Sequence, residues 1–288
     1  MKITLIPACY NSAATIRTAI ESVLSQRGVD VEYIVVDGGS SDGTVDIVKE
    51  YATRQSSQAI RQSVNPSICQ SPISLKWISE KDRGMYDAIN KGIKMATGEV
   101  VGILNADDVL ADDETLKRIA ELFSRKERKG RKEDGLVERV DCVYADIRFV
   151  REGETVEALR EAKTVRYCSA KRWRPWVFRF AAMVPHPSFY VRRECFERLG
   201  GYSLDYRICA DFELELRYLY LAKLKAAYLP ECVVVMRMGG MSTAGWRSNI
   251  VINREDLRAL RANDVWSCLP LIYLKYLFKI WGFVFRKR

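Results

Sequence analysis

The sequence predicts an α/β protein in which helices cover both faces of a mainly parallel sheet. Short apolar runs alternate along the chain with segments whose apolar residues recur at helical spacing. These runs are almost continuously apolar, which is typical of strands buried on both faces of a parallel sheet. A length of 288 residues and a hydrophobic content of 48% suffice for one large domain of this class or two small ones.

The first third of the chain follows this alternation most regularly. Turns that contain Gly, Asn or Asp separate each strand from the helix that follows it. Residues 53–74, rich in Ser and Gln, are interpreted as a surface connection. In chain order we expect strands at residues 3–8, 31–36, 76–79 and 99–104, and helices at residues 11–24, from 45 to about 51, and at 85–95.

The second half of the chain is predicted to extend the sheet. The run 124–134 mixes both charge signs and is interpreted as a solvated helix end followed by a loop. Beyond it, strand-like and helix-like patterns resume. The expected elements are strands at 140–150, 156–165 and 188–193, a helix that ends at Leu199, and a helix from Ala210 to Leu219.

The net charge and the cysteines narrow the classes of partner and compartment. Lys and Arg number 46 against 37 Asp and Glu, so the formal charge is +9. This excess favours an anionic partner, such as nucleic acid, a phosphorylated small molecule or an acidic membrane surface. The eight cysteines include no CxxC pair, which argues against a zinc ribbon. With no secretory signal at the N-terminus, we expect reduced thiols in a cytoplasmic protein.

Two adjacent carboxylates, Asp107 and Asp108, follow the apolar run 99–104. Open α/β sheets bind ligands at the carboxyl ends of their strands, and repulsion between neighbouring acids is relieved most directly by a divalent cation. Alternatively, one of the two acids caps the next helix. A second predicted strand also ends in an acid, Asp37, and should open on the same edge of the sheet. This second acidic strand end favours the cation site.

The residues at this edge match what a nucleoside diphosphate requires. Tyr10 can supply a wall for the base, Asp37 an acceptor for a base N–H, and the Asp107–Asp108 pair a cation for the diphosphate. The chain contains no P-loop, and no GxGxxG pattern follows the first strand. Neutralisation of the phosphates must therefore come from a metal and from basic side chains such as Arg83.

Four motifs occur in order: Pro7-Ala8-Cys9-Tyr10-Asn11, residues 36–44, residues 82–92, and Asn105-Ala106-Asp107-Asp108. Together they resemble the family 2 glycosyltransferases with the GT-A fold, in particular those of bacterial cell-surface polysaccharide and O-antigen assembly. The resemblance covers roughly residues 1–240. It implies a GT-A domain at 1–240, with a nucleotide-sugar-binding half at 1–110 and an acceptor half at 111–240, followed by a C-terminal helical segment at 241–288.

The resemblance also implies which residues bind the donor. The usual second motif is Asp-Asp-Gly-Ser, where this chain has Asp37-Gly38-Gly39-Ser40, so the Asp that matches the base contact is kept. Arg83 would lie beside the base or the phosphates. The implied set also includes Pro7 and Tyr10 near the nucleobase, Asp37 on a base N–H such as uracil offers, Asp107 near the ribose or the metal, and Asp108 on Mn²⁺ or Mg²⁺.

Asp211 matches the position of the family's catalytic base. Many relatives have Glu-Asp where this chain has Ala210-Asp211. Such a carboxylate would deprotonate the acceptor hydroxyl while the metal stabilises the departing diphosphate, and the anomeric centre would be inverted. The alternative is that Asp211 caps a helix. His186, the only histidine, lies between two prolines and is expected in the active site, contacting the acceptor, a phosphate or the metal.

Two further segments predict contact with a membrane. Residues 171–180 interleave cations with large aromatic side chains, which suits a membrane interface, a nucleic-acid strand or a loop over the active site. Residues 270–285 are mostly apolar, but Lys275 and Lys279 interrupt them. An in-plane amphipathic helix with its lysines among lipid headgroups therefore fits better than a membrane span. The alternative is that this helix packs on the enzyme's own core or on another subunit.

These features predict a metal-dependent, inverting glycosyltransferase, peripheral on the cytoplasmic face of the cell membrane. The donor would be a nucleotide sugar, with UDP favoured over GDP or dTDP, and the acceptor a saccharide linked to polyprenyl diphosphate. A polyprenyl-phosphate sugar synthase is the enzymatic alternative, and it would need no base for an acceptor hydroxyl. A catalytically inactive scaffold and a nucleic-acid-binding protein are the other hypotheses. The acidic strand ends argue against nucleic acid, because they would repel its phosphates.

Overall fold

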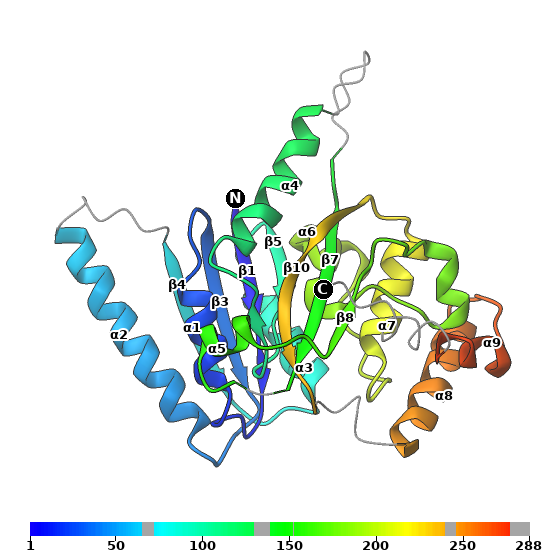
Figure 1. The fold of residues 1–288 in the computed structure, drawn as a ribbon, viewed down its shortest axis with the longest axis horizontal. Coiled ribbons are helices and arrows are strands. Elements are labelled where there is room, and N and C mark those ends of the chain that lie inside the picture. Colours follow the sequence, from blue (N-terminus) through cyan, green and yellow to red (C-terminus); the bar gives the residue numbers. More distant parts are fainter. Residues whose placement is uncertain (65–71, 130–138, 152, 240–245, 277–288) are drawn as a thin grey trace.

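The predicted sheet is present at the centre of the molecule, with helices on both of its faces (Figure 1). The structure is a computed structural model that describes residues 1–64, 72–129, 139–151, 153–239 and 246–276. The strands are β1 (Lys2–Ile6), β2 (Ala8–Cys9), β3 (Asp30–Asp37), β4 (Ile73–Ser79), β5 (Val100–Ile103), β6 (Val109–Leu110), β7 (Cys142–Val150), β8 (Arg166–Cys168), β9 (Tyr190–Arg192) and β10 (Ala226–Arg237). They follow the order β2-β3-β1-β5-β9-β7-β10-β6, with β4 paired to β3 and β8 to β7.

Parallel pairing dominates the N-terminal part of the sheet and changes at β9. β1 lies between β3 and β5 and is parallel to both, whereas β9 is antiparallel to β5 and to β7. β10 then runs parallel to β7. Gly102 permits the close β5–β9 approach, because a Cβ at that position would collide with the ring of Tyr190. The carboxyl ends of β1, β3 and β5 therefore share one edge of the sheet, as the sequence predicts.

Helices on the two faces of the sheet enclose two apolar cores. Successive side chains of β3 point to opposite faces, so Tyr33 and Val35 enter one core while Ile34 and Val36 enter the other. The helices are α1 (Ile16–Leu24), α2 (Thr44–Val64), α3 (Met85–Met95), α4 (Thr115–Lys129), α5 (Val156–Glu161), α6 (Arg193–Leu199), α7 (Ala210–Glu215), α8 (Trp246–Ala262) and α9 (Leu269–Tyr273), with shorter helical turns η1 (Pro175–Phe180), η2 (His186–Ser188) and η3 (Leu216–Leu221). α1, α2 and α4 cover the first core, and α3 with the C-terminal helices covers the second.

The helix α2 is longer than predicted. It continues to Val64 through residues that the sequence analysis interprets as a surface connection. Gln55 ties this extension to the sheet: its Nε2 donates to the carbonyl oxygen of Ile73 at 2.7 Å, and its Oε1 accepts from the amide of Leu75 at 2.7 Å. These bonds satisfy backbone groups of β4, and they explain why a polar segment stays helical beside that strand.

The strand predicted at 156–165 is wrong. Residues 156–161 form α5, and the strand that follows is the shorter β8. The Thr155 side chain caps α5 by accepting a hydrogen bond from the amide of Ala158 at 3.1 Å. Only Val156 and Leu159 of the helix are buried, which is helical spacing rather than the alternation of a strand.

The C-terminal segment packs on the protein as far as it is described. Ile272 of α9 is fully buried in the second core. Lys275, predicted to lie among lipid headgroups, is instead buried, with its Nζ 2.5 Å from Oδ2 of Asp256 in α8. A buried ammonium needs such a partner, because an unpaired charge is costly to remove from water. Lys279 and the rest of residues 277–288 lie outside the described residues. No helix in the described part of the chain is long and apolar enough to cross a membrane.

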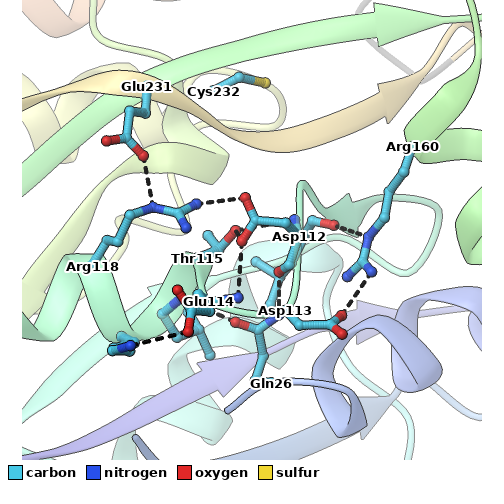
Figure 2. Close-up of polar contacts among 12 residues, drawn as sticks. Gln26, Asp112, Asp113, Glu114, Thr115, Arg118, Arg160, Glu231 and Cys232 are labelled. Carbon is cyan, nitrogen blue, oxygen red and sulfur yellow. Dashed lines mark hydrogen bonds and ion pairs between the residues drawn. The ribbon is translucent and has the colours of Figure 1, made fainter. Parts of the chain in front are cut away.

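A cluster of polar and charged side chains holds the start of α4 in place (Figure 2). Asp112 accepts a hydrogen bond from the amide of Glu114 at 2.9 Å, and its other oxygen lies 2.6 Å from a guanidinium nitrogen of Arg118. Asp112 thus holds the turn before this helix, Gln26 accepts from the amide of Leu116 in its first turn at 3.0 Å, and the described bonds of Asp107 and Asp108 include none to the helix. Gln26, Asp113, Arg160 and Glu231 complete the cluster.

Candidate active site

A cleft of about 2100 Å³ opens at the carboxyl ends of the parallel strands. One wall follows β2, the turn at 38–39 and the loop at 105–107, and the opposite wall comprises residues 166–173, η2 and the first turn of α7. Ligands of open α/β sheets bind at this edge. Four predicted site residues line the cleft: Tyr10, Asp107, His186 and Asp211.

Tyr10 lies on a tightly held turn in the cleft lining, just after β2. The next residue, Asn11, has a φ of 49°, a conformation that Asn tolerates better than most residues. Its amide donates to Oγ of Ser40 at 2.8 Å, and its Oδ1 accepts from the amide of Ser41 at 3.0 Å. The Tyr10 side chain is 66% exposed, so its ring is available to stack on a planar base.

Asp37 is buried beneath the cleft surface and does not line it. One carboxylate oxygen accepts from the amides of Gly39 and Ser40, each at 3.0 Å, and from the hydroxyl of Ser79 at 2.6 Å. The Ser40 hydroxyl donates to the other oxygen. Burial by itself would raise the pKa of Asp37, but these hydrogen bonds outweigh it and lower the pKa below its usual value. The carboxylate is therefore ionised and anchors the turn after β3.

Asp82 lines the cleft, although it is not among the site residues predicted from sequence; it belongs to the third motif, residues 82–92. It occupies space left open by Gly38, since a Cβ at Gly38 would lie 2.5 Å from Oδ2 of Asp82. Its Oδ1 accepts from the amide of Gly84 at 2.8 Å. Gly38 stands where the family pattern has its second Asp, so this chain brings a carboxylate to the same turn from a different segment.

Asp107 and Asp108 lie on the loop after β5 and have different surroundings. Asp107 lines the cleft, whereas Asp108 is fully buried. Oδ2 of Asp108 accepts from the side-chain amide of Asn105 at 2.8 Å, but its buried Oδ1 has no hydrogen-bond partner. Burial, reinforced by the neighbouring charge of Asp107, raises the pKa of Asp108 well above its usual value. Burial also raises the pKa of Asp107.

This pair fits a divalent cation. A buried carboxylate oxygen without a partner beside a second carboxylate is an oxygen-rich environment, and the charge of the nearby Arg237 does not offset the effect of burial on Asp108. The described residues contain no group of three or more acidic, histidine or cysteine side chains that could hold a metal by themselves. Mg²⁺ and similar cations commonly use one or two carboxylates and take their remaining ligands from water and substrate phosphates. The arrangement therefore suits a metal that binds together with a diphosphate.

Arg237, at the end of β10, binds the backbone of the loop that carries Asp107 and Asp108, and it also lines the cleft. Its guanidinium donates to the carbonyl oxygen of Asp107 at 2.5 Å, to Oγ1 of Thr18 at 3.0 Å and to the carbonyl oxygen of Gly153 at 3.1 Å. Burial lowers the pKa of Arg237, and the charges of the acid pair oppose this effect. Arg237 is not among the residues predicted from sequence, because it is the pairing of β10 with β6, the short strand just after the Asp107–Asp108 loop, that brings it to this edge.

Asp211 lies on the opposite wall, in the first turn of α7. The N-cap of α7 is Cys209, so Asp211 is not the helix cap. Its Oδ1 accepts from the amide of Phe212 at 2.8 Å and from the Tyr86 hydroxyl at 3.2 Å. Burial raises the pKa of Asp211 to about 6, although these hydrogen bonds oppose the increase. A carboxylate with this pKa accepts a proton readily while it remains mostly ionised at neutral pH.

His186 is linked to Asp211 through two tyrosines. Its Nε2 lies 2.7 Å from the hydroxyl of Tyr202, whose ring stacks on Tyr86 with centroids 5.6 Å apart. Burial lowers the pKa of His186 to about 4, so the imidazole is neutral at physiological pH. Tyr86 and Tyr202 are in turn buried. The described contacts of His186 thus support the side of the site that carries Asp211.

Besides Asp37 and Asp108, two further predicted site residues lie away from the cleft surface. Pro7 is buried between β1 and β2, where its carbonyl oxygen accepts from the amide of Val36 at 3.0 Å. Arg83 is exposed and lies 3.6 Å from Asp87, and it does not line the cleft. The cations that do line it on this side include Lys81.

Comparison with known proteins gives a consistent assignment. Residues 4–130 match the family model described as Glycosyl transferase family 2. The PGL/p-HBAD biosynthesis glycosyltransferase of Mycobacterium tuberculosis (strain ATCC 25177 / H37Ra) is 26% identical over 257 residues, which cover 89% of this chain and 83% of that protein.

Two solved structures have the same fold. The structure of S. aureus TarS 1–349 in complex with UDP-GlcNAc aligns with a TM-score of 0.59 and 17% identity over 90% of this chain, and this chain spans 66% of its length. The mannosyltransferase PcManGT from Pyrobaculum calidifontis in complex with GDP-Man and Mn²⁺ aligns with a TM-score of 0.58 and 20% identity, covering 98% of this chain and 72% of that one. These similarities show the GT-A fold.

Proposed function

Given that this chain is a glycosyltransferase with the GT-A fold and a family 2 domain over residues 4–130, we propose that it is a metal-dependent, inverting enzyme that uses a nucleotide-sugar donor. The observation that carries this proposal is the cleft itself. It has a paired-carboxylate loop at Asp107–Asp108 on one wall and a carboxylate suited to proton transfer, Asp211, on the other.

The donor nucleotide is proposed to lie along the wall formed by β2, the 38–39 turn and Asp82. The exposed ring of Tyr10 would stack on the base, and a carboxylate would accept a base N–H. Asp82 supports this second role better than Asp37, because Asp82 lines the cleft while the oxygens of Asp37 are already engaged. We propose UDP as the nucleotide, because uracil offers such an N–H and a structural neighbour was solved with UDP-GlcNAc; guanine and thymine also offer a ring N–H, so a screen of nucleotide sugars decides among them.

Asp107 and Asp108 would hold Mn²⁺ or Mg²⁺, with the buried Oδ1 of Asp108 as the oxygen that gains a partner. When bound, the cation offsets the negative charge of the diphosphate leaving group. Arg237 holds the backbone of this loop through its bond to the Asp107 carbonyl oxygen, and so keeps Asp107 in the cleft lining beside the buried Asp108. The PcManGT structure, which contains Mn²⁺, is consistent with this use of a metal.

Asp211 is proposed to be the general base. It would take the proton from an acceptor hydroxyl as the oxygen attacks the anomeric carbon, while the bond from that carbon to the diphosphate breaks. Attack from the side opposite the leaving group inverts the configuration, so an α-linked donor gives a β-glycoside. Tyr86, Tyr202 and His186 position this carboxylate. A base in this position supports a hydroxyl acceptor over a lipid phosphate, which would need no base.

The acceptor is proposed to be a saccharide linked to polyprenyl diphosphate, used in surface polysaccharide assembly at the inner face of the cell membrane. The formal charge of +9 and the cations at the cleft, such as Lys171 and Arg172, support an anionic lipid-linked acceptor.

A thermal-shift screen of nucleotide sugars, with and without Mn²⁺, tests the donor and metal assignments together. We expect at least one UDP-sugar to raise the Tm of the wild type only when Mn²⁺ is present, because binding to the native state alone stabilises it. Asp108→Ala should not show the Mn²⁺-dependent increase, whereas the matched variant Asp113→Ala, outside the cleft, should retain it. Identical responses of the wild type and Asp108→Ala to every donor would show that the metal assignment is wrong.

A further inference from the structure

Two segments that each predict membrane contact lie side by side in the fold. Residues 175–180 of the basic aromatic segment form η1, and the start of the C-terminal segment lies in α9 (Leu269–Tyr273), which packs against η1 (Figure 1). The hydroxyl of Ser267, just before α9, donates to the carbonyl oxygen of Arg179 at the end of η1, at 2.6 Å. Residues distant in sequence therefore form one continuous surface.

This surface exposes large apolar side chains. Trp176 in η1 is 57% exposed, Trp266 is 69% exposed and Tyr273 in α9 is 52% exposed. Exposed cations accompany them, among them Arg174 and Arg179. Aromatic side chains prefer the membrane–water interface, and lysines and arginines are attracted to anionic headgroups. We call this surface the docking face and define it as Arg174, Trp176, Arg179, Trp266, Leu269, Tyr273 and Leu274.

The active-site cleft opens beside the docking face. Trp176 belongs to both, because it is exposed and also lines the cleft, and Lys171 and Arg172 line the cleft just before η1 in the chain. The sequence beyond α9 has the same character as the docking face. Residues 277–285 read Leu-Phe-Lys-Ile-Trp-Gly-Phe-Val-Phe, and three basic residues follow them.

We propose that the docking face rests on an anionic lipid bilayer, so that the cleft opens at the membrane surface. A lipid-linked acceptor would then present its phosphate groups to Lys171 and Arg172 while its hydrocarbon stays in the bilayer. This inference rests on the proposed function for the nature of the acceptor. The binding of the docking face to a bilayer does not depend on it.

Vesicle co-sedimentation of the full chain tests the docking face. We expect the wild type to bind phosphatidylcholine vesicles weakly and vesicles that also contain phosphatidylglycerol strongly. Charge reversal by Arg174→Glu with Arg179→Glu should lower the partition coefficient roughly tenfold or more, since each basic residue near the surface adds to the attraction. Trp266→Ser with Tyr273→Ser should also lower it several-fold, by removing interfacial aromatic rings.

A matched control on the other side of the molecule separates docking from overall charge. Lys49→Glu with Arg54→Glu makes the same charge change on α2, which lies at the opposite end of the sheet (Figure 1). It should leave anionic-vesicle binding within about twofold of the wild type, because charges beyond a Debye length are screened. The proposal is overturned if this control weakens binding as much as the docking-face variants, or if the docking-face variants bind like the wild type.

A chain that ends at Tyr276 tests whether the following residues dock by themselves. This end point keeps the buried Lys275–Asp256 pair intact. The shortened chain should keep part of the preference for anionic vesicles, whereas complete loss of binding would assign docking to residues 277–288 alone and overturn the proposal.

The donor-induced Tm shift, measured without vesicles, separates the docking proposal from the proposed function. Its absence in a protein that still binds vesicles would reject only the proposed function.

Discussion

Replacing Tyr86 by Phe removes one hydroxyl group beside the proposed base and leaves the buried ring in place. That hydroxyl lies 3.2 Å from Oδ1 of Asp211 and also donates to the carbonyl oxygen of Ile208. Burial raises the pKa of Asp211 to about 6, and the Tyr86 hydrogen bond opposes this increase. Loss of the hydroxyl should therefore raise the pKa of Asp211 further.

The size of the shift follows from the geometry. A hydrogen bond to a charged group contributes about 1.5–3 kcal/mol, and one pKa unit corresponds to about 1.4 kcal/mol. The bond to Asp211 is long, and the single hydroxyl proton is shared with the Ile208 carbonyl oxygen, so we take the lower end of this range. A shift of about one unit is expected.

The pH dependence of sugar transfer measures this shift. A general base works only when it is deprotonated, so activity is lost as the pH falls through its pKa. In the wild type the acidic limb should be half-maximal near the Asp211 pKa of about 6. In Tyr86→Phe the limb should move up by about one pH unit, with a smaller change at alkaline pH.

Tyr218→Phe is the matched control for this experiment. Its hydroxyl is also in the interior and donates to the carbonyl oxygen of Gly200 at 2.6 Å, and its described hydrogen bonds include none to Asp211. The control should lower stability but leave the acidic limb unmoved. An acidic limb in Tyr86→Phe that coincides with that of the wild type would refute the assignment of this limb to Asp211.

Three further substitutions have expected outcomes. Asp108→Asn should raise the Tm of the metal-free protein by a few degrees, because burial next to Asp107 disfavours an ionised carboxylate there and an amide carries no charge. The variant should also lose the Mn²⁺-dependent donor shift, and a lower metal-free Tm would contradict this reasoning. Asp82→Asn should weaken UDP binding, measured by calorimetry, by about tenfold with little change in Tm. Asp37→Asn should instead lower the free energy of unfolding by about 1–3 kcal/mol, because it disturbs the hydrogen bonds that hold the turn after β3. The reverse pattern would show that Asp37 makes the base contact. Lys275→Met should lower the free energy of unfolding, measured in urea, by about 3–5 kcal/mol, because it leaves Asp256 buried without its partner. The double variant Lys275→Met with Asp256→Leu should recover most of this loss, and a single variant as stable as the wild type would contradict the prediction.

The donor side of the cleft is the part that sequence predicts best. The loop of Asp107 and Asp108 follows the short, fully buried strand β5, Tyr10 follows β2, and Asp37 is the last residue of β3. Strands that run parallel in one sheet bring such residues to one edge, so local patterns are sufficient. Sequence patterns do not show how far each side chain is buried. In the structure Asp37 and Asp108 lie beneath the cleft surface, while Asp82 occupies the space at Gly38 and lines the cleft.

The base side of the cleft depends on contacts that no local pattern contains. Tyr86 and Tyr202 are on segments far apart in the chain, and their stacking beside His186 results from the packing of α3 against the C-terminal half. Arg237 reaches Asp107 because β10 pairs antiparallel with β6, the strand that follows the Asp107–Asp108 loop. The strand expected at 156–165 fails for a local reason, because the Thr155 cap and the spacing of Val156 and Leu159 indicate a helix.

Comparison of Asp211→Asn with Asp108→Asn tests the central claim most directly, namely that the two walls of the cleft divide donor binding from proton transfer. Transfer from the donor identified by thermal shift is measured together with the donor-induced Tm shift. Asp211→Asn should keep the Mn²⁺-dependent shift while transfer falls by about 10²–10⁴-fold, and Asp108→Asn should lose both. Undiminished transfer by Asp211→Asn, or loss of donor binding in both variants alike, would contradict the assignment.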